Sequence, residues 1–261
     1  MNWFMNKYLA FKGTHPHSQM VFILGTGRSG THWIGNILAA HEDIRVTFER
    51  PSIFRMVTAM ALNPDLKPGR VSGVVRRYRV EHARVAPRHY VDKSHPNLWL
   101  ATELAEAFPN ALFVGIERNP YATVASMLRH SGVLRWCEIW EEFPIPNRFL
   151  GITESNRADY EQLSLAGRCA LRWLSHADRM RELRSELGER LEVFGYEDLI
   201  ENTRDQLHRL QAFLKLRTPI PQPSPKRESL DKWRTNLTSQ QRADIERIVG
   251  FKAPDGACRQ D

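Results

Sequence analysis

The stretch from Met20 to Trp33, MVFILGTGRSGTHW, decides the fold. Five apolar residues, typical of a buried strand, lead into a loop that carries Gly25, Gly27 and Gly30, and apolar residues resume at helical spacing over 34–38. A glycine-rich loop between a strand and a helix presents backbone N–H groups and the positive end of the helix dipole to an anion. The sequence therefore predicts a phosphate-binding loop.

The side chains between these glycines strengthen that prediction. Arg28 supplies a planar fork of donors that suits phosphate or sulfate oxygens, and Ser29, Thr31 and His32 add further donors. A purely structural turn, which is the alternative, has no need of them. A P-loop for nucleoside triphosphates carries a lysine directly after its last glycine, whereas Thr31 follows Gly30 here. The loop thus has the glycines of a phosphate loop without its lysine.

Strands and helices alternate along the rest of the chain. Strands are predicted over 20–24, 89–91, 111–116 and 190–194, and helices from 34, over 98–108, from 119, and over about 160–187, 197–214 and 238–249. This alternation predicts an α/β fold of three layers, α/β/α, with a central parallel sheet and ligands at the carboxyl ends of its strands. Between these elements, 41–88 is polar and rich in arginine, 135–157 is expected to be a loop or lid over the site, and 218–227 a proline-rich loop.

Composition indicates an ordinary globular protein with an anionic ligand. The 261 residues include 42% hydrophobic and 26% charged residues, and the formal net charge is +7. We expect a leader over 1–19 and a single domain over 20–261. The sequence has no zinc finger or aromatic RNA-binding signature, so nucleic acid is not an expected partner.

Cysteine usage and the N-terminus bear on cellular setting. Cys137, Cys169 and Cys258 are odd in number and far apart in sequence, which argues against a disulfide framework and a structural zinc site. The N-terminal MNWFMNKYLAFKG lacks the order of a signal peptide, and no run of about 18 apolar residues occurs. A flexible or core-docked leader is favoured over a helix that associates weakly with a membrane surface, and a cytoplasmic setting is expected.

A second anion site is predicted where the strand over 111–116 ends. Arg118 leaves this strand, and Ser126 follows eight residues later in the helix that begins at Asn119-Pro120. Ser126 shares one helical face with Asn119 and the small Ala122, so Arg118 and Ser126 can converge on one anion. Taken alone, this segment is better explained by the alternative, a helix cap at Asn119-Pro120 with Arg118 in a surface ion pair.

Together the two segments resemble the sulfotransferases that use 3′-phosphoadenosine-5′-phosphosulfate (PAPS). The run Arg28-Ser-Gly-Thr-His-Trp33 is similar to their 5′-phosphosulfate loop, in which the basic residue stands two positions before the glycine. Arg118-Asn-Pro with Ser126 resembles their 3′-phosphate site. The resemblance implies that the loop from Gly27 to Trp33 binds the co-substrate PAPS, with Trp33 beside the adenine.

Further landmarks extend the resemblance from about residue 20 to 250. Tyr196-Glu-Asp-Leu199 is similar to a strand end of the family, and the helix after it closes in Phe213-Leu214, with Lys215 in place of the family's glycine. Lys232-Trp233-Arg234 resembles the late segment that closes over the nucleotide. The resemblance therefore implies the P-loop-like sulfotransferase architecture of a bacterial-type member, and adds Tyr196, Lys232, Trp233 and Arg234 to the nucleotide site.

Transfer of a sulfuryl group needs stabilised charge and a base for the acceptor proton. Arg28 and Lys93 are the candidates for charge stabilisation. Glu49 resembles the glutamate that takes the proton in protein-tyrosine sulfotransferases, and His95 resembles the histidine that does so in cytosolic small-molecule sulfotransferases. Both stay open, with a slight preference for Glu49. No metal-binding motif occurs, so no metal is expected.

The sequence leaves the acceptor and the oligomeric state open. The acceptor hydroxyl or amine could belong to a small molecule, glycan, lipid or peptide, and the arginines over 70–88 either hold an anionic acceptor or form a solvated face. Two other functions compete with sulfuryl transfer. One is a P-loop kinase or nucleotide hydrolase, which the missing lysine disfavours, and the other is a non-enzymatic polyanion-binding protein.

Overall fold

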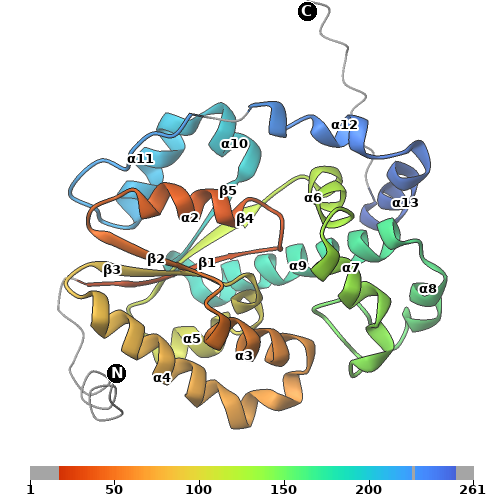
Figure 1. The fold of residues 1–261 in the computed structure, drawn as a ribbon, viewed down its shortest axis with the longest axis horizontal. Coiled ribbons are helices and arrows are strands. Elements are labelled where there is room, and N and C mark those ends of the chain that lie inside the picture. Colours follow the sequence, from red (N-terminus) through yellow and green to blue (C-terminus); the bar gives the residue numbers. More distant parts are fainter. Residues whose placement is uncertain (1–17, 225–226, 251–261) are drawn as a thin grey trace, which may run out of the picture.

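A five-stranded parallel sheet forms the centre of the molecule in the computed structural model, which describes residues 18–224 and 227–250 (Figure 1). Its strands are β1 (Met20–Gly25), β2 (Ile44–Phe48), β3 (His89–Lys93), β4 (Leu112–Glu117) and β5 (Leu191–Gly195). They lie in the order β2-β3-β1-β4-β5, with all neighbours parallel. The carboxyl ends of β1, β3 and β4 therefore meet at the middle of one edge.

Helices cover both faces of the sheet (Figure 1). One face carries α2 (Thr31–Ala39), α10 (Tyr196–Glu201) and α11 (Thr203–Phe213), and the other carries α3 (Pro51–Leu62), α4 (Lys67–Val85), α5 (Ala101–Ala107) and α9 (Leu165–Leu187). The remaining helices gather beside the carboxyl edge: α6 (Pro120–Met127), α7 (Ser131–Glu138), α8 (Arg157–Gln162), α12 (Lys232–Asn236) and α13 (Ser239–Val249). None of the helices in the described part of the chain is both long and apolar enough to span a bilayer.

Alternating side chains of the strands build a separate core on each face. Phe22 of β1 packs against Phe113 of β4 and Tyr78 of α4, with ring centroids 5.6 and 5.1 Å apart. Ile23, the next residue of β1, points to the opposite face and packs with α2 and α10. Because β1 is buried on both faces, it holds the loop that follows it in a fixed place.

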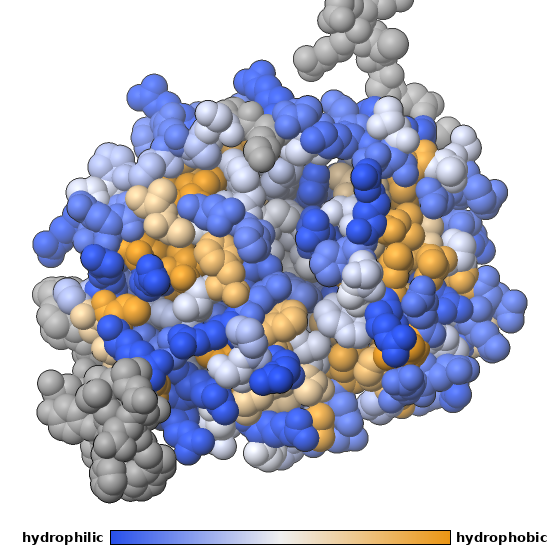
Figure 2. All heavy atoms as spheres, viewed as in Figure 1, coloured by the Kyte–Doolittle hydropathy of each residue, from blue (hydrophilic) through white to orange (hydrophobic). Residues whose placement is uncertain are grey.

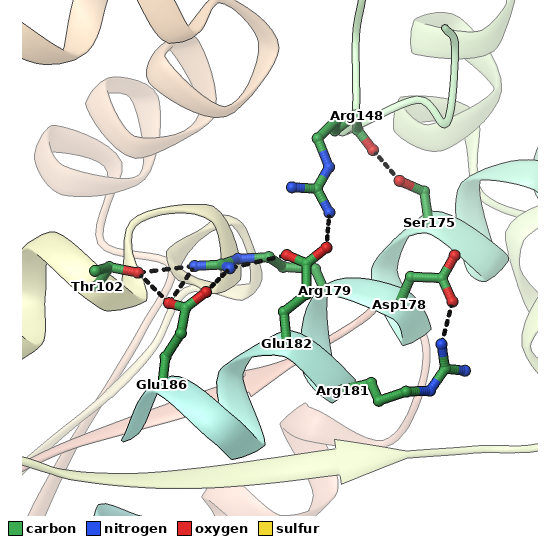
Figure 3. A network of polar contacts seen from close by, with 8 residues as sticks. All are labelled: Thr102, Arg148, Ser175, Asp178, Arg179, Arg181, Glu182 and Glu186. Atoms are coloured by element: carbon green, nitrogen blue, oxygen red, sulfur yellow. Dashed lines mark hydrogen bonds and ion pairs between the residues drawn. The ribbon is translucent and has the colours of Figure 1, made fainter. Parts of the chain in front are cut away.

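Helix α9 is tied to its neighbours by a polar network on its outer surface (Figure 3). The guanidinium of Arg179 donates to Glu186 at 2.6 Å and to Glu182 at 3.0 Å within α9, and to Thr102 of α5 at 2.8 Å. Glu182 also accepts from Arg148, which lies in the loop before α8. These bonds fix the register of α9 against α5 and this loop.

Most of the predicted elements are confirmed. The α/β class, the parallel sheet and four of the five strands agree with the sequence-based expectation. The last helix begins where expected, because Thr238 and Gln241 form a reciprocal capping box. The proline-rich loop is confirmed over 218–224, whereas residues 225–226 and 1–17 of the expected leader lie outside the described residues.

The region over 41–88 differs most from the sequence-based prediction. It contains β2, α3 and α4, which the sequence reading did not resolve. β2 is an edge strand whose residues after Ile44 are only partly covered, so its apolar alternation is weak. On α4, the buried Val74, Val75 and Tyr78 alternate with exposed arginines that dominate the composition. Polar character concealed the helical periodicity here.

Two other expectations were wrong in part. The segment 135–157 is not simply a loop or lid over the site, because α7 occupies its start and Phe149, Leu150 and Ile152 are fully buried in the core. The long helix begins at Leu165 instead of 160, because the Ser164 hydroxyl accepts from Gly167 N at 3.2 Å and caps it.

Candidate functional site

The loop between β1 and α2 has the geometry of an anion cradle. Ser29 N donates to Thr26 O at 3.0 Å, which closes the turn. Gly30, the N-cap of α2, has a φ of 102°, and a Cβ there would lie 2.3 Å from the ring of Tyr196. Only glycine satisfies both the left-handed backbone and this close approach. The Ser29 hydroxyl is buried and has no hydrogen-bond partner among the described residues.

Arg28 connects this loop to the second predicted anion site. Its backbone is left-handed, with a φ of 80°, which a non-glycine residue rarely adopts. Its Nε donates to Ser126 Oγ of α6 at 3.1 Å, although 98 residues separate the two. The structure therefore places Arg28 against Ser126, whereas the sequence predicts Ser126 beside Arg118 at a second anion site.

Arg118, the charged residue of the second predicted anion site, directly follows β4. Its guanidinium stacks 4.2 Å from the ring centroid of Tyr196 and donates to Ser229 O at 2.9 Å. Its Nε is buried without a partner among the described residues, and burial lowers the pKa of the group. Asn119 begins α6 by accepting from Tyr121 N and Ala122 N, which turns the chain directly after Arg118.

The two candidate bases are hydrogen-bonded to each other. Glu49 Oε1 accepts from Lys93 Nζ at 2.5 Å and pairs with His95 Nδ1 at 3.2 Å. Glu49 follows β2 in a left-handed conformation with a φ of 44°, and its N–H donates to Lys93 O at 3.0 Å. Since β2 and β3 are neighbours in the sheet, their carboxyl ends place Glu49, Lys93 and His95 at one point.

Electrostatics fixes the protonation of this cluster. Burial raises the pKa of Glu49, but the hydrogen bond from His95 and the charge of Lys93 outweigh it and bring the pKa to about 2. Burial lowers the pKa of His95 to about 4, against the opposing hydrogen bond to Glu49. Glu49 is therefore a carboxylate and His95 a neutral imidazole at pH 7. The carboxylate must accept from Nδ1–H, which leaves the lone pair on Nε2.

Asp92, the residue before Lys93, accepts the hydrogen bonds of a buried network. Asp92 is fully buried in β3 and accepts from Tyr78 Oη at 2.9 Å, Asn97 Nδ2 at 3.0 Å and Thr47 Oγ1 at 2.9 Å. Burial raises the pKa of Asp92 to about 6, although these hydrogen bonds oppose it. The network joins β2, β3, α4 and the turn after β3, and so holds the backbone that presents Lys93.

One cavity of about 390 Å³ lies at the carboxyl edge of the sheet. The space-filling view shows a hollow near the centre of this face, bordered by hydrophilic residues (Figure 2). The predicted site residues on its wall are Gly27, Arg28, Gly30, Thr31, His32, Trp33, Glu49, Lys93, His95, Arg118, Ser126 and Tyr196. Trp33 meets the ring of Tyr196 edge-on at 5.9 Å, which leaves an aromatic wall for a planar base.

The segment Lys232-Trp233-Arg234 does not lie at this cavity. Trp233 is buried between α6 and α13, with its ring 4.9 Å from that of Tyr121. Lys232 pairs with Glu228 at 3.8 Å, and Arg234 with Asp231 at 2.9 Å. None of the three lines the cavity. Here the indole serves the core, as an isolated tryptophan often does.

The sequence does not predict several further wall residues, nor Ser229, which contacts the wall residues Arg118 and Tyr196 without lining the cavity itself. Ser229 accepts from Arg118 through its carbonyl and exchanges a hydroxyl hydrogen bond with Tyr196 Oη at 2.9 Å. Phe54, His130 and Trp136 line the side of the cavity next to His95. Nothing in their local sequence marks them, except that Trp136 falls in the aromatic segment that was expected near the site. Among the described residues, no group of three or more His, Cys, Asp or Glu side chains is arranged to hold a metal.

Comparisons with known proteins agree on one family. Residues 18–247 match the family described as sulfotransferase domain. A Caenorhabditis briggsae protein with a provisional name as a protein-tyrosine sulfotransferase is 23% identical over 210 residues, which are 76% of this chain and 66% of that protein. The chain thus spans just under two thirds of the length of this relative.

Solved structures show the same fold. The sulfotransferase domain from the curacin biosynthetic pathway superposes with a TM-score of 0.56 at 18% identity, covering 91% of this chain and 99% of that one. The sulfotransferase domain from the olefin synthase of Synechococcus PCC 7002 gives 0.55 at 17% identity, with coverages of 93% and 99%. Since the family match covers most of the chain, this protein belongs to the sulfotransferase family.

Proposed function

We propose that this chain transfers the sulfuryl group of PAPS to a hydroxyl or amine of an acceptor. The observation that carries the proposal is the convergence of Arg28, Arg118 and Ser126 with the Glu49–Lys93–His95 cluster on one cavity. One end of the cavity can hold the two phosphate ends of a nucleotide, and the other holds groups that can move a proton. Both are needed for the reaction.

The anion-binding residues fit PAPS by their unused donors. Arg118, which lines the cavity, has a buried Nε without a partner among the described residues, and this is costly unless a ligand satisfies it. We assign the loop over 27–32 to the 5′-phosphosulfate, and Arg118 with Ser126 to the 3′-phosphate. Trp33 and Tyr196 then flank the adenine. Lys232, Trp233 and Arg234 lie outside this set, because they do not reach the cavity.

The proton of the acceptor goes to Glu49 in this proposal. The bonds from Lys93 and His95 to its carboxylate both use Oε1, and no hydrogen bond reaches Oε2 from residues 18–224 or 227–250. Glu49 also lines the cavity and is 35% exposed, whereas His95 Nε2 is buried beside Gly27. Oε2 is thus the open acceptor, and His95 is a positioning residue that holds the carboxylate.

Lys93 couples the two halves of the reaction. As the acceptor oxygen bonds to sulfur and the sulfur–oxygen bond to phosphate breaks, charge develops on the departing phosphate. Lys93 Nζ donates to Glu49 before the reaction, and it neutralises this charge when it turns towards the phosphate. Its departure raises the proton affinity of Glu49 at the moment when the acceptor proton must leave.

Two measurements test the proposal. Calorimetric titration with adenosine 3′,5′-bisphosphate should show binding without magnesium, and much weaker binding of ATP. Radiolabelled PAPS, incubated with phenols, alcohols, amines, glycans and tyrosine peptides, should label one acceptor class. Magnesium-dependent transfer from ATP would favour the kinase alternative instead. Salt-sensitive binding of polyanions with no response to the bisphosphate would favour the polyanion-binding alternative.

A further inference from the structure

Two cysteines far apart in sequence meet behind the cavity wall. Cys137 lies on α7 and Cys169 on α9, and both are fully buried in the cluster that joins these helices to α6 and α13. The two thiols are close enough for each to shift the pKa of the other. Arg168, the residue before Cys169, donates to Cys137 O at 3.0 Å and fixes α7 on α9. The proposed transfer reaction uses neither thiol.

Beside this pair lies a buried charge that lacks polar partners. Arg172, one turn after Cys169 on α9, is fully buried, and none of its guanidinium nitrogens has a hydrogen-bond partner among the described residues. Its charge is stacked 4.6 Å from the ring of Phe149 and 5.9 Å from that of Trp136. A guanidinium in such a place is costly unless an anion accompanies it.

Cys137 is suited to supply that anion. The neighbouring Cys169 thiol and the charge of Arg172 lower the pKa of the Cys137 thiol, although burial opposes this. The other ionisable groups that face Arg172 are Cys169, Tyr160, His95 and His176. Neither imidazole supplies a negative charge, and burial raises the pKa of Tyr160. The thiolate of Cys137 is the anion that this environment favours, and thiolates are the reactive form of cysteine.

The pair is adjacent to the catalytic side of the cavity. Trp136 directly precedes Cys137 on α7 and lines the cavity, with its ring 6.1 Å from that of His95. Phe149, which stacks on Arg172, lies 5.2 Å from Trp136. A change in the bonding or charge of Cys137 therefore acts on the ring that forms the wall beside His95.

We propose that Cys137 and Cys169 are a reversible oxidation site, in which a disulfide joins α7 to α9 and shifts Trp136 at the acceptor end of the cavity. The oxidant is a peroxide. The Cys137 thiolate attacks one peroxide oxygen, the oxygen–oxygen bond breaks, and sulfenic acid and hydroxide form. The Cys169 thiol then displaces the sulfenic oxygen as water and completes the disulfide. The two sulfurs lose two electrons, and hydrogen peroxide is reduced to water and hydroxide.

Access does not require a permanent channel. α7 has only eight residues, and it contains Gly132 and several exposed positions. Short peripheral helices open locally far more often than a whole domain unfolds, and hydrogen peroxide is scarcely larger than water. Oxidation then removes the negative partner of Arg172, which favours rearrangement of the stacked Trp136 and Phe149.

Peptide mass spectrometry tests the site without any assay of activity. The reduced protein is exposed to hydrogen peroxide, denatured, blocked with N-ethylmaleimide and digested with trypsin. We expect a cross-link between the peptides 136–148 and 169–172, reversed by dithiothreitol, while the peptide 253–259 with Cys258 stays unlinked. Cys137→Ser and Cys169→Ser should each abolish the cross-link, and Cys258→Ser is the matched control that should keep it. Sulfinic acid at Cys137 without a cross-link, or pairing with Cys258, would overturn the proposal.

The effect on the cavity has its own readouts. The difference in tryptophan fluorescence between the wild type and Trp136→Phe gives the emission of Trp136. Oxidation should change this emission, and the measurement does not depend on which reaction the protein catalyses. The acceptor KM, which rests on the proposed function, should change about fivefold, the lower end of typical coupling between sites. A cross-link that leaves both unchanged would refute the link to the acceptor site. A protein without transferase activity that still forms the cross-link would refute only the proposed function.

Discussion

Glu49 and His95 share a hydrogen bond of 3.2 Å between Oε1 and Nδ1, although 46 residues separate them. The sequence offers them as rival bases, because each resembles the base of a different group of sulfotransferases. Because they are in contact, they belong to one hydrogen-bonded cluster, in which the imidazole holds the carboxylate and Lys93 binds the same oxygen. Such a unit is tested best by combining substitutions.

Glu49→Gln should lower kcat by about 10²- to 10⁴-fold, the usual contribution of a general base. His95→Asn, which retains a donor for Oε1, should cost less. The double variant should be no slower than Glu49→Gln alone, because His95 acts only through Glu49. The measurement is kcat with saturating PAPS and acceptor. If His95→Asn is the slower single variant, the imidazole is the base.

Activity should be nearly flat on the acid side of neutrality. Since the pKa of His95 is about 4 and that of Glu49 about 2, neither group takes up a proton between pH 8 and about pH 5. The value of kcat/KM, measured in a constant-ionic-strength buffer series, should fall only below about pH 5. An inflection near pH 6.5, the ordinary pKa of histidine, would contradict the buried neutral imidazole if it persists in Asp92→Asn, which removes the carboxyl whose pKa is about 6.

Stability should respond to Glu49 in acid. Its folded pKa of about 2 lies below the ordinary 4.5, so its ionised form stabilises the fold above pH 4.5, and this is lost as the pH falls towards 2. Glu49→Gln should remove that part of the slope in urea unfolding between pH 5 and 2.5. The effect is modest because the carboxylate is 35% exposed. An unchanged slope would show that Lys93 does not hold Glu49 in solution.

Arg118→Ala should weaken binding of adenosine 3′,5′-bisphosphate by about 30- to 900-fold, since loss of a buried charged donor costs about 2–4 kcal/mol. Arg28→Ala should weaken binding in the same range and should also lower kcat, because Arg28 faces the transferred group in the proposal. Calorimetry gives the affinity, with the exposed Arg204→Ala on α11 as a matched control. Wild-type affinity in both variants would remove the assignment of the phosphate sites.

The sequence could indicate most of the residues proposed for the anion sites, because each set lies within one short segment. Gly30 and Arg28 lie within one short loop, and Arg118 and Ser126 within one strand–helix turn. Trp136 could not be predicted, because it reaches the cavity only through the packing of α7. The contact of Ser229 with Arg118 likewise depends on where the segment before α12 lies. The position of Trp233 is likewise set by tertiary packing, which its local sequence does not reveal. Its motif resembles a nucleotide-binding segment, but its tertiary neighbours place it in the core.

Lys215 is the position where the family's glycine is missing, and the structure shows what the substitution costs. α11 ends at Phe213, and Lys215 has a φ of 54°, with its N–H bonded to Ala212 O and that of Leu216 to Gln211 O. This is the left-handed residue that commonly ends a helix, and glycine adopts it without strain.

Lys215→Gly should therefore raise the free energy of unfolding by about 0.5–1 kcal/mol, since relief of the strained backbone outweighs the extra freedom that glycine gives the unfolded chain. Lys215→Ala is the control, because it removes the same exposed charge but keeps a Cβ in the left-handed conformation. Urea unfolding should show a gain for glycine alone, at an unchanged m-value. Equal stability of the two variants would mean that the lysine backbone carries no strain here.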